Sequence, residues 1–240
     1  MRLFSFDSEA SSYSASCEVQ KFFLQLLIDR LVQKWGKNFK DILDLGCGTG
    51  ASLQAFQDHH IAFDHFIGCD LSENMLKVFN PPSAIQNKVS LICQDFNICL
   101  EQISSPHLIF SSSSLQWATS LKHTLGLISQ HTSSKIALSI MTANTLKSFH
   151  SFLDSKSPLP TKENMQKLLL DFFEGEIEIA HKILTFSTNK DLILHLRNTG
   201  IMGGGVLKYK QAKKILEYTG DLEYESLIFI GQPKQTKGAV

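Results

Sequence analysis

The stretch that decides the fold runs from Asp41 to Gly50 and reads Asp-Ile-Leu-Asp-Leu-Gly-Cys-Gly-Thr-Gly. Its apolar start predicts a short buried strand, and the alternating glycines that follow predict a tight loop. Residues 51–58 then read as a helix. A strand, a glycine loop and a helix in this order are typical of the first unit of a nucleotide-binding α/β sheet.

The glycines stand at Gly46, Gly48 and Gly50, with Cys47 between the first two and Asp44 two residues before them. This spacing differs from the dinucleotide pattern G-x-G-x-x-G, in which a helix start presents N–H donors to a pyrophosphate. A ligand with an amino-acid group needs instead an acceptor for its ammonium, which Asp44 or the loop carbonyls supply. The pattern therefore favours S-adenosylmethionine over NAD. A glycine-rich turn without a ligand is the alternative.

This segment resembles the first motif of the class I, Rossmann-like methyltransferases, and two later segments fit the same family. Asp70 ends the second predicted strand, where an acid can accept both ribose hydroxyls of an adenosine. Leu71 follows it in a string, Asp-Leu-Ser-x-x-Met-Leu, that is common in the family. Asp95 and Phe96 end the third predicted strand, where relatives bind the adenine amino group and ring. A solvated strand-end acid at Asp70 and a helix N-cap at Asp95 are the alternatives.

The fourth predicted strand, 107–110, is followed by four serines that begin at Ser111. The carboxyl end of this strand faces the crevice where ligands bind in such sheets. We expect Ser111 and the serines after it to form a hydroxyl-lined floor close to the methyl donor.

The whole pattern predicts an α/β protein with the Rossmann-like class I methyltransferase fold. We expect a central seven-stranded, mostly parallel sheet with helices on both faces, a helical N-terminal arm and an insertion after the fifth strand. The expected organisation is a single domain over 1–240: arm and helix 1–36, cofactor-binding core 37–144, helical insertion or lid 145–175, C-terminal part of the sheet 176–232 and a disordered tail from 233 to 240. Within these, we predict helices over 17–35, 116–130, 145–153, 161–173 and 189–198, and late strands over 177–186 and 227–231.

Composition limits the class of partner. Lysine plus arginine and aspartate plus glutamate number 23 each, so the formal net charge is zero. This balance weighs against nucleic acid or a charged membrane surface as partner. The five cysteines form no C-x-x-C pair, and the first ten residues lack the apolar core of a signal peptide. We therefore expect a cytoplasmic monomer that uses no metal.

Weaker matches run in order along most of the chain and resemble the malonyl-acyl-carrier-protein O-methyltransferases of biotin synthesis. They are the opening at 6–13, Gln20 at a similar spacing, Ser113–Trp117 and Leu196–Gly200. The resemblance implies methyl transfer to the free carboxylate of a malonyl thioester, which an acyl-carrier protein presents.

One departure concerns the acceptor. That family usually carries Asn-Arg-Phe near the segment 155–160, where this chain has Lys156 and Pro158 but no arginine. An arginine would suit a carboxylate through a bidentate pair. Lys156 is the candidate substitute as a point charge. Tyr13 is the candidate for orienting the acceptor carboxyl, with simple packing of the arm as its alternative.

The expected chemistry asks little of the protein. A carboxylate acceptor is already ionised at neutral pH, so it needs no general base. The protein then has to orient the reactants and exclude water. The sequence places no histidine–acid pair at a strand end, which agrees with this chemistry. The alternatives are methylation of another small molecule, such as a quinone ring, and a non-catalytic assembly protein. No Asn-Pro-Pro-Tyr motif points to a nucleic-acid substrate.

Overall fold

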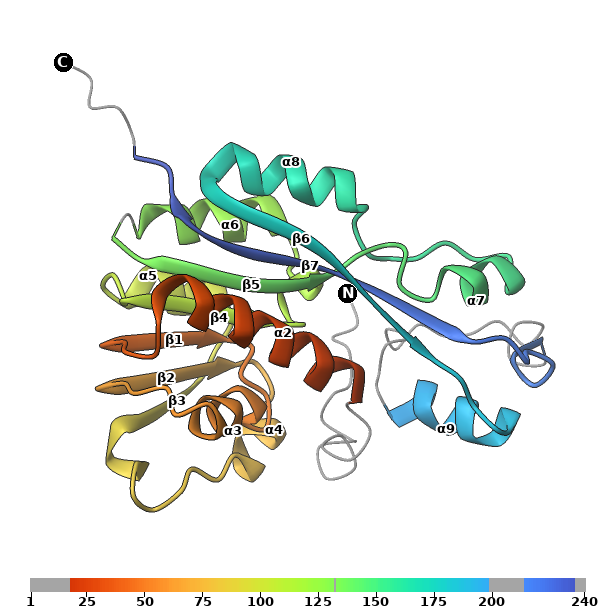
Figure 1. The fold of residues 1–240 in the computed structure, drawn as a ribbon, viewed down its shortest axis with the longest axis horizontal. Helices are drawn as coiled ribbons and strands as arrows, with labels where there is room; N and C mark the ends of the chain where they lie inside the picture. The colour runs from red at the N-terminus through yellow and green to blue at the C-terminus, as the bar shows by residue number, and fades with distance from the viewer. Residues whose placement is uncertain (1–17, 132, 199–213, 236–240) are drawn as a thin grey trace.

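The computed structural model describes residues 18–131, 133–198 and 214–235, and these ranges form one mixed sheet with flanking helices (Figure 1). The strand order is β3-β2-β1-β4-β5-β7-β6. Neighbours among β1 to β5 are parallel, whereas β7 is antiparallel to β5 and β6. The predicted Rossmann-like fold, with seven mostly parallel strands, is confirmed. The strands are β1 Asp41–Leu45, β2 His65–Asp70, β3 Val89–Cys93, β4 Leu108–Ser112, β5 Lys135–Met141, β6 Phe173–Leu184 and β7 Leu222–Pro233.

Helices cover both faces of the sheet because each central strand is apolar on both sides. Ile42 of β1 belongs to one buried cluster and its neighbour Leu43 to the other. The first cluster contains the inner faces of α2 and α3, and the second those of α5, α6 and α8. The helices are α2 Glu18–Trp35, α3 Ala51–Asp58, α4 Glu73–Val78, α5 Phe96–Gln102, α6 Leu121–Gln130, α7 Lys147–Phe152, α8 Lys162–Phe172 and α9 Asn189–Asn198, with short 3₁₀ turns η2 Gln86–Lys88 and η3 Leu115–Trp117.

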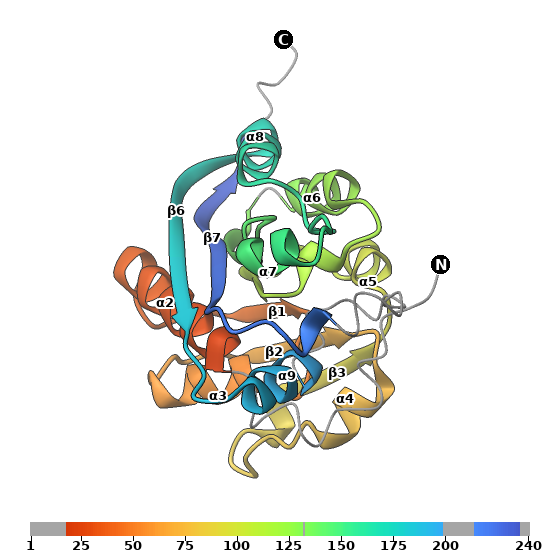
Figure 2. The ribbon, with the colours of Figure 1, turned by 90° about the vertical axis from the view of Figure 1, so that its right-hand side faces the viewer.

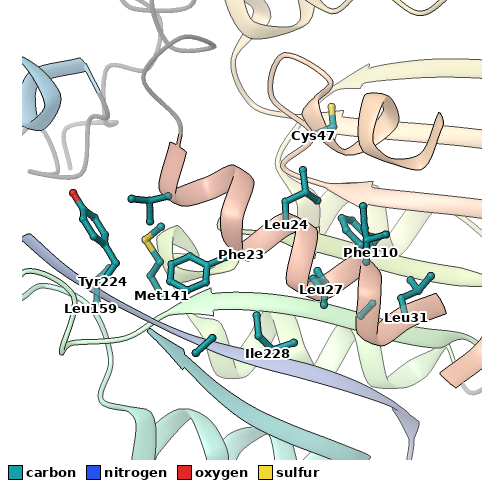
Figure 3. Packing of buried hydrophobic residues seen from close by; sticks show 14 of the residues in the cluster. Phe23, Leu24, Leu27, Leu31, Cys47, Phe110, Met141, Leu159, Tyr224 and Ile228 are labelled. Atoms are coloured by element: carbon teal, nitrogen blue, oxygen red, sulfur yellow. The ribbon is translucent and has the colours of Figure 1, made fainter. Parts of the chain in front are cut away.

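Helix α2 fixes one wall of the later site. Its residues Phe23, Leu27 and Leu31 are fully buried at helical spacing and point from the helix towards the sheet (Figure 3). Beside this apolar face, Arg30 of α2 donates two hydrogen bonds to Glu178 of β6, with distances of 2.7 and 3.2 Å. Apolar packing and an ion pair therefore both hold the helix against the sheet.

The C-terminal strands are longer than predicted. The sequence pattern predicted strands over 177–186 and 227–231, but β6 and β7 pair along their whole length, from Phe173 opposite Pro233 to Leu184 opposite Leu222. Pro233 thus ends a strand instead of starting the tail, and residues 236–240 lie outside the described ranges. Antiparallel pairing supplies hydrogen bonds that no local pattern reveals.

Two predicted boundaries around β4 are also wrong. The strand runs from Leu108 to Ser112, so Ser111 is a strand residue and not part of a loop. The helix predicted over 116–130 is broken into the turn η3 and α6, because Ser120 caps α6 by accepting from the His123 N–H at 3.3 Å.

The insertion after β5 divides into two parts. Helix α8 buries Met165 and Leu169 in the cluster beneath α6, so it belongs to the helical layer of the sheet. Helix α7 lies at the carboxyl edge of the parallel strands, and Figure 2 views the molecule from this edge. The ring of Phe149 in α7 packs edge-on against the ring of Tyr218, with 5.0 Å between the ring centroids. The role of 145–175 as a lid and the division of the chain into domain segments stay predictions. None of the helices in the described ranges has the length and apolar character that a membrane crossing requires.

Candidate functional site

The glycine loop leaves β1 with backbone angles that favour glycine. Gly46 has a φ of 77° and Gly48 a φ of 53°. A Cβ on Gly46 would overlap the side chain of Ser114, whose hydroxyl donates to the Gly46 carbonyl at 3.0 Å. A Cβ on Gly48 would meet no atom within 4 Å. The missing side chain at Gly46 therefore lets the segment with Ser114 approach the glycine loop, and the missing side chain at Gly48 leaves open space above the loop.

That space is a pocket of about 350 Å³ at the carboxyl edge of β1, within the usual size range of small-molecule sites. Its floor is the glycine loop with the first turn of α3, and α2 forms a side wall. The segment after α4 and the serines after β4 complete it. Beyond the loop and α3, the lining residues are Gln20, Lys21, Leu24, Val78, Phe79, Asn80, Pro82 and Ser112–Ser114.

Asp44 is the carboxylate of this pocket. It is 1% exposed and accepts a hydrogen bond from the Ser52 hydroxyl. Burial raises the pKa of Asp44 to about 7; the nearby Asp70 adds to this shift and the Ser52 hydrogen bond opposes it. A cationic ligand group beside Asp44 would favour the ionised form. The position therefore suits an ammonium.

The remaining titratable groups of the pocket are poor bases or nucleophiles. Burial, together with Asp44 and Asp70, raises the pKa of the Cys47 thiol, so the thiol is neutral at physiological pH. No histidine lines the pocket in the described part of the chain. The described residues contain no group of three or more metal-ligating side chains that could hold a metal ion.

The structure gives Asp70 a contact that the sequence did not predict. One carboxylate oxygen accepts from the Gly48 N–H and the other from the Ser72 N–H, each at 2.9 Å. Asp70 thereby ties the end of β2 to the glycine loop, and it does not line the pocket. Its ribose contact stays a prediction, as does the cofactor-binding role of Leu71, which is 54% exposed beside it.

Three other predicted site residues have structural roles in the described protein. Asp95 is the N-cap of α5 and accepts from the Asn97 N–H at 2.8 Å, as the alternative reading proposed. Phe96 is half-buried against the cluster beneath α5. Ser111 is fully buried, and its hydroxyl donates to the Leu45 carbonyl at 2.8 Å, so Ser111 does not form the expected floor. The adenine contacts of Asp95 and Phe96 stay predictions.

Of the two acceptor candidates, the structure describes one, and that one lies outside the pocket lining. Tyr13 lies outside the described residues. Lys156 is exposed in the loop between α7 and α8 and is absent from the pocket lining. The structure therefore brings together Asp44, Cys47 and the three glycines, but it does not bring Lys156 to them.

The sequence predicted a hydroxyl lining from the serines after Ser111, but it gave no site role to Gln20. Three buried oxygens, the Gln20 Oε1 and the hydroxyls of Ser112 and Ser113, have no hydrogen-bond partner among the described residues. Ser113 also has a φ of 57°, which is rare for serine and turns the chain sharply after β4. Unpaired buried oxygens are costly unless a ligand or water satisfies them. They mark this pocket as a binding site for a polar molecule.

Comparison with known proteins agrees with the geometry. A family described as a methyltransferase domain matches residues 42–134, which include the glycine loop, β2, β3 and β4. The match covers the floor of the pocket and the serines after β4. The chain thus resembles the class I methyltransferases in the segment that forms most of the site.

Named relatives narrow the resemblance. A malonyl-[acyl-carrier protein] O-methyltransferase of Priestia megaterium is 31% identical over 123 residues, which are 50% of this chain and 43% of that protein. Another, from a Marinomonas species, is 31% identical over 116 residues, 48% of this chain and 41% of that protein. The matched part therefore spans less than half the length of either relative.

A solved structure of the plantazolicin methyltransferase BpumL, in complex with a monoazolic desmethylPZN analogue and SAH, has the same fold. Its TM-score is 0.54 at 15% identity, with 94% of this chain and 90% of that chain covered. At this identity the likeness extends to the fold alone.

Proposed function

Because residues 42–134 match a methyltransferase domain and the sheet has the Rossmann-like methyltransferase order, we propose that the protein is an S-adenosylmethionine-dependent O-methyltransferase. We further propose that it methylates the free carboxylate of a malonyl thioester carried by an acyl-carrier protein, as in biotin synthesis. The observation that carries the proposal is the pocket: a buried acid and an open glycine loop suit the donor, and the described lining residues include no histidine. A cytoplasmic location and a monomeric state stay predictions.

The cofactor fits the groups that line the pocket. The open face of Gly48 leaves room for the amino-acid end, and Asp44 would hold the ammonium. When bound, S-adenosylmethionine supplies an electrophilic methyl group. The backbone N–H groups in the first turn of α3 are also available to a ligand, because the N-cap Gly50 has no side chain that could accept from them.

Among the described lining residues, none is free to act as a base in our proposal, which favours an acceptor that is already anionic. The Asp44 carboxylate accepts from the Ser52 hydroxyl and, in our proposal, binds the ligand ammonium. The Cys47 thiol is neutral because its pKa is raised. A phenol or carbon acid would need a group that removes its proton. A carboxylate needs only orientation and the exclusion of water.

The test is transfer of label from methyl-labelled S-adenosylmethionine to candidate acceptors. We expect a base-labile methyl ester on malonyl-carrier protein or malonyl-CoA and none on acetyl-CoA, which lacks the free carboxylate. Gly48→Val serves as the control without a functional cofactor site. Labelling of a phenol or quinone in preference to the malonyl thioesters would refute the proposed acceptor, and failure to bind the cofactor would refute the proposed activity.

A further inference from the structure

The wall that α2 contributes has an unpaired acceptor. Gln20 lines the pocket, and its buried Oε1 has no hydrogen-bond partner in the described ranges. Leu24, one helical turn further on, is 5% exposed and also lines the pocket, so this face of α2 is fixed towards the site. The Gln20 oxygen is thus held dry beside the pocket, where a donor from a ligand would satisfy it.

The neighbouring residue is a cation at the pocket mouth. Lys21 is exposed, lines the pocket and makes no salt bridge with any described acid. By contrast, Lys34 on the same helix pairs with Glu176 at 2.5 Å. Lys21 is also the one cation among the described lining residues.

The charges of the two walls are complementary. Asp44 lies buried at the floor, whereas Lys21 stands exposed on α2. A ligand group that carries both an ammonium and a carboxylate matches this arrangement, because each of its charges then meets an opposite one. A simple anion or a simple cation would leave one of the two walls unmatched.

We propose that Gln20 and Lys21 of α2 form a subsite for the zwitterionic amino-acid end of the cofactor. The Gln20 oxygen accepts a hydrogen bond from the ammonium that Asp44 also holds, and the Lys21 ammonium pairs with the carboxylate. The cofactor's identity rests on the proposed function, but the assignment of α2 goes beyond it.

The experiment compares two ligands by calorimetry. S-Adenosylhomocysteine has the amino-acid end, whereas 5′-methylthioadenosine has the same nucleoside without it. The variants are Gln20→Leu and Lys21→Met, with Lys21→Arg to retain the charge. The matched controls on the same helix are Gln25→Leu, whose side chain is exposed and bonds to Asp29, and Lys34→Met.

We expect Gln20→Leu to weaken S-adenosylhomocysteine about tenfold, the range for losing a hydrogen bond to a charged group. Lys21→Met should weaken it about threefold to fivefold, because an exposed pair contributes less, and the loss should shrink at high salt. Affinity for 5′-methylthioadenosine should stay unchanged in both, which also shows that the variants fold. Lys21→Arg and the two controls should bind like the wild type.

The remaining outcomes distinguish failure of the proposed cofactor from failure of the α2 subsite. If the wild type binds neither ligand, the proposed cofactor is wrong and the subsite falls with it. If the wild type binds S-adenosylhomocysteine and both variants match it, the proposed function stands and the α2 subsite is refuted. Equal losses for both ligands would also refute it, since the effect would then not lie at the amino-acid end.

Discussion

Two carboxylates in the described protein are buried, Asp44 on β1 and Glu225 on β7, and they differ in how fully they are paired. Glu225 accepts from the Thr142 hydroxyl at 2.5 Å and from the Asn144 amide at 2.9 Å, and His181 lies 3.8 Å from its other oxygen. Asp44 accepts a hydrogen bond from one side chain, that of Ser52, among the described residues.

The surroundings sharpen the contrast. Around Glu225 the polar groups satisfy one another, and the Thr145 hydroxyl donates to the Glu225 carbonyl at 3.0 Å. Around Asp44 the pocket walls carry buried oxygens of Gln20, Ser112 and Ser113 without partners. Burial alone therefore does not identify a binding site. Unmet hydrogen-bonding capacity beside an open volume does, and the predictions below test this distinction.

The largest expected effect is at Gly48. Gly48→Val should reduce cofactor affinity by on the order of 100-fold or more, because the side chain enters the open space above the loop and valine resists a φ of 53°. Calorimetry with S-adenosylhomocysteine measures it. Gly36→Val is the matched control, since Gly36 also has a positive φ and open space but lies outside the pocket. Unchanged binding by Gly48→Val would remove the loop from the site.

Glu225→Ala should lower the free energy of unfolding by about 3 kcal/mol, because it leaves Thr142 and Asn144 without their acceptor in a buried place. Cofactor affinity should change less than twofold, a rough threshold for a residue that does not line the pocket. Chemical denaturation and calorimetry measure the two effects. A large loss of affinity with little loss of stability would mean that Glu225 belongs to the functional site after all.

Asp70→Ala should weaken the cofactor by about 2 kcal/mol, the range for charge-assisted hydrogen bonds. Part of this loss would come from the glycine loop, because Asp70 also accepts a hydrogen bond from the Gly48 N–H. Asp95→Ala should weaken the cofactor less, having one bond to lose, while it costs α5 its cap. If Asp95→Ala proves the more damaging for binding, the assignment of strand ends to ribose and adenine is wrong.

The sequence predicted the features that local rules determine. The glycine loop was predictable because φ above zero at Gly46 and Gly48 favours glycine, and the buried strand before it because of its apolar run. The reach of β7 to Pro233 was not, because it depends on the partner strand. The spacing of Gln20 matched the resembling family, but no local pattern assigned Gln20 or Lys21 to the site. Their place in the site follows from where α2 crosses the sheet, which is a property of tertiary packing.

The smallest and most specific effect concerns the protonation of Asp44. Its pKa in the free protein is raised to about 7 by burial, so lowering the pH below 7 protonates it and removes the charge that would meet the ammonium. Affinity for S-adenosylhomocysteine should therefore fall about tenfold from pH 7 to pH 5.5, a range in which the ligand ammonium stays protonated.

The direction of this pH dependence follows because the pKa of Asp44 is lower in the complex than in the free protein. Binding beside an ammonium lowers its pKa, so the complex holds fewer protons than the free protein and binding strengthens as the pH rises towards and through 7. Calorimetry near pH 6.5 in two buffers of different ionisation enthalpy should detect proton release. Asp44→Asn should bind more weakly at pH 7, with little pH dependence and no release. Glu225→Gln is the comparison, because Glu225 does not line the pocket and the variant should keep the wild-type pH profile. If Asp44→Asn instead retains the pH dependence of the wild type, another group titrates, and the unpaired carboxylate on β1 is not what receives the ligand.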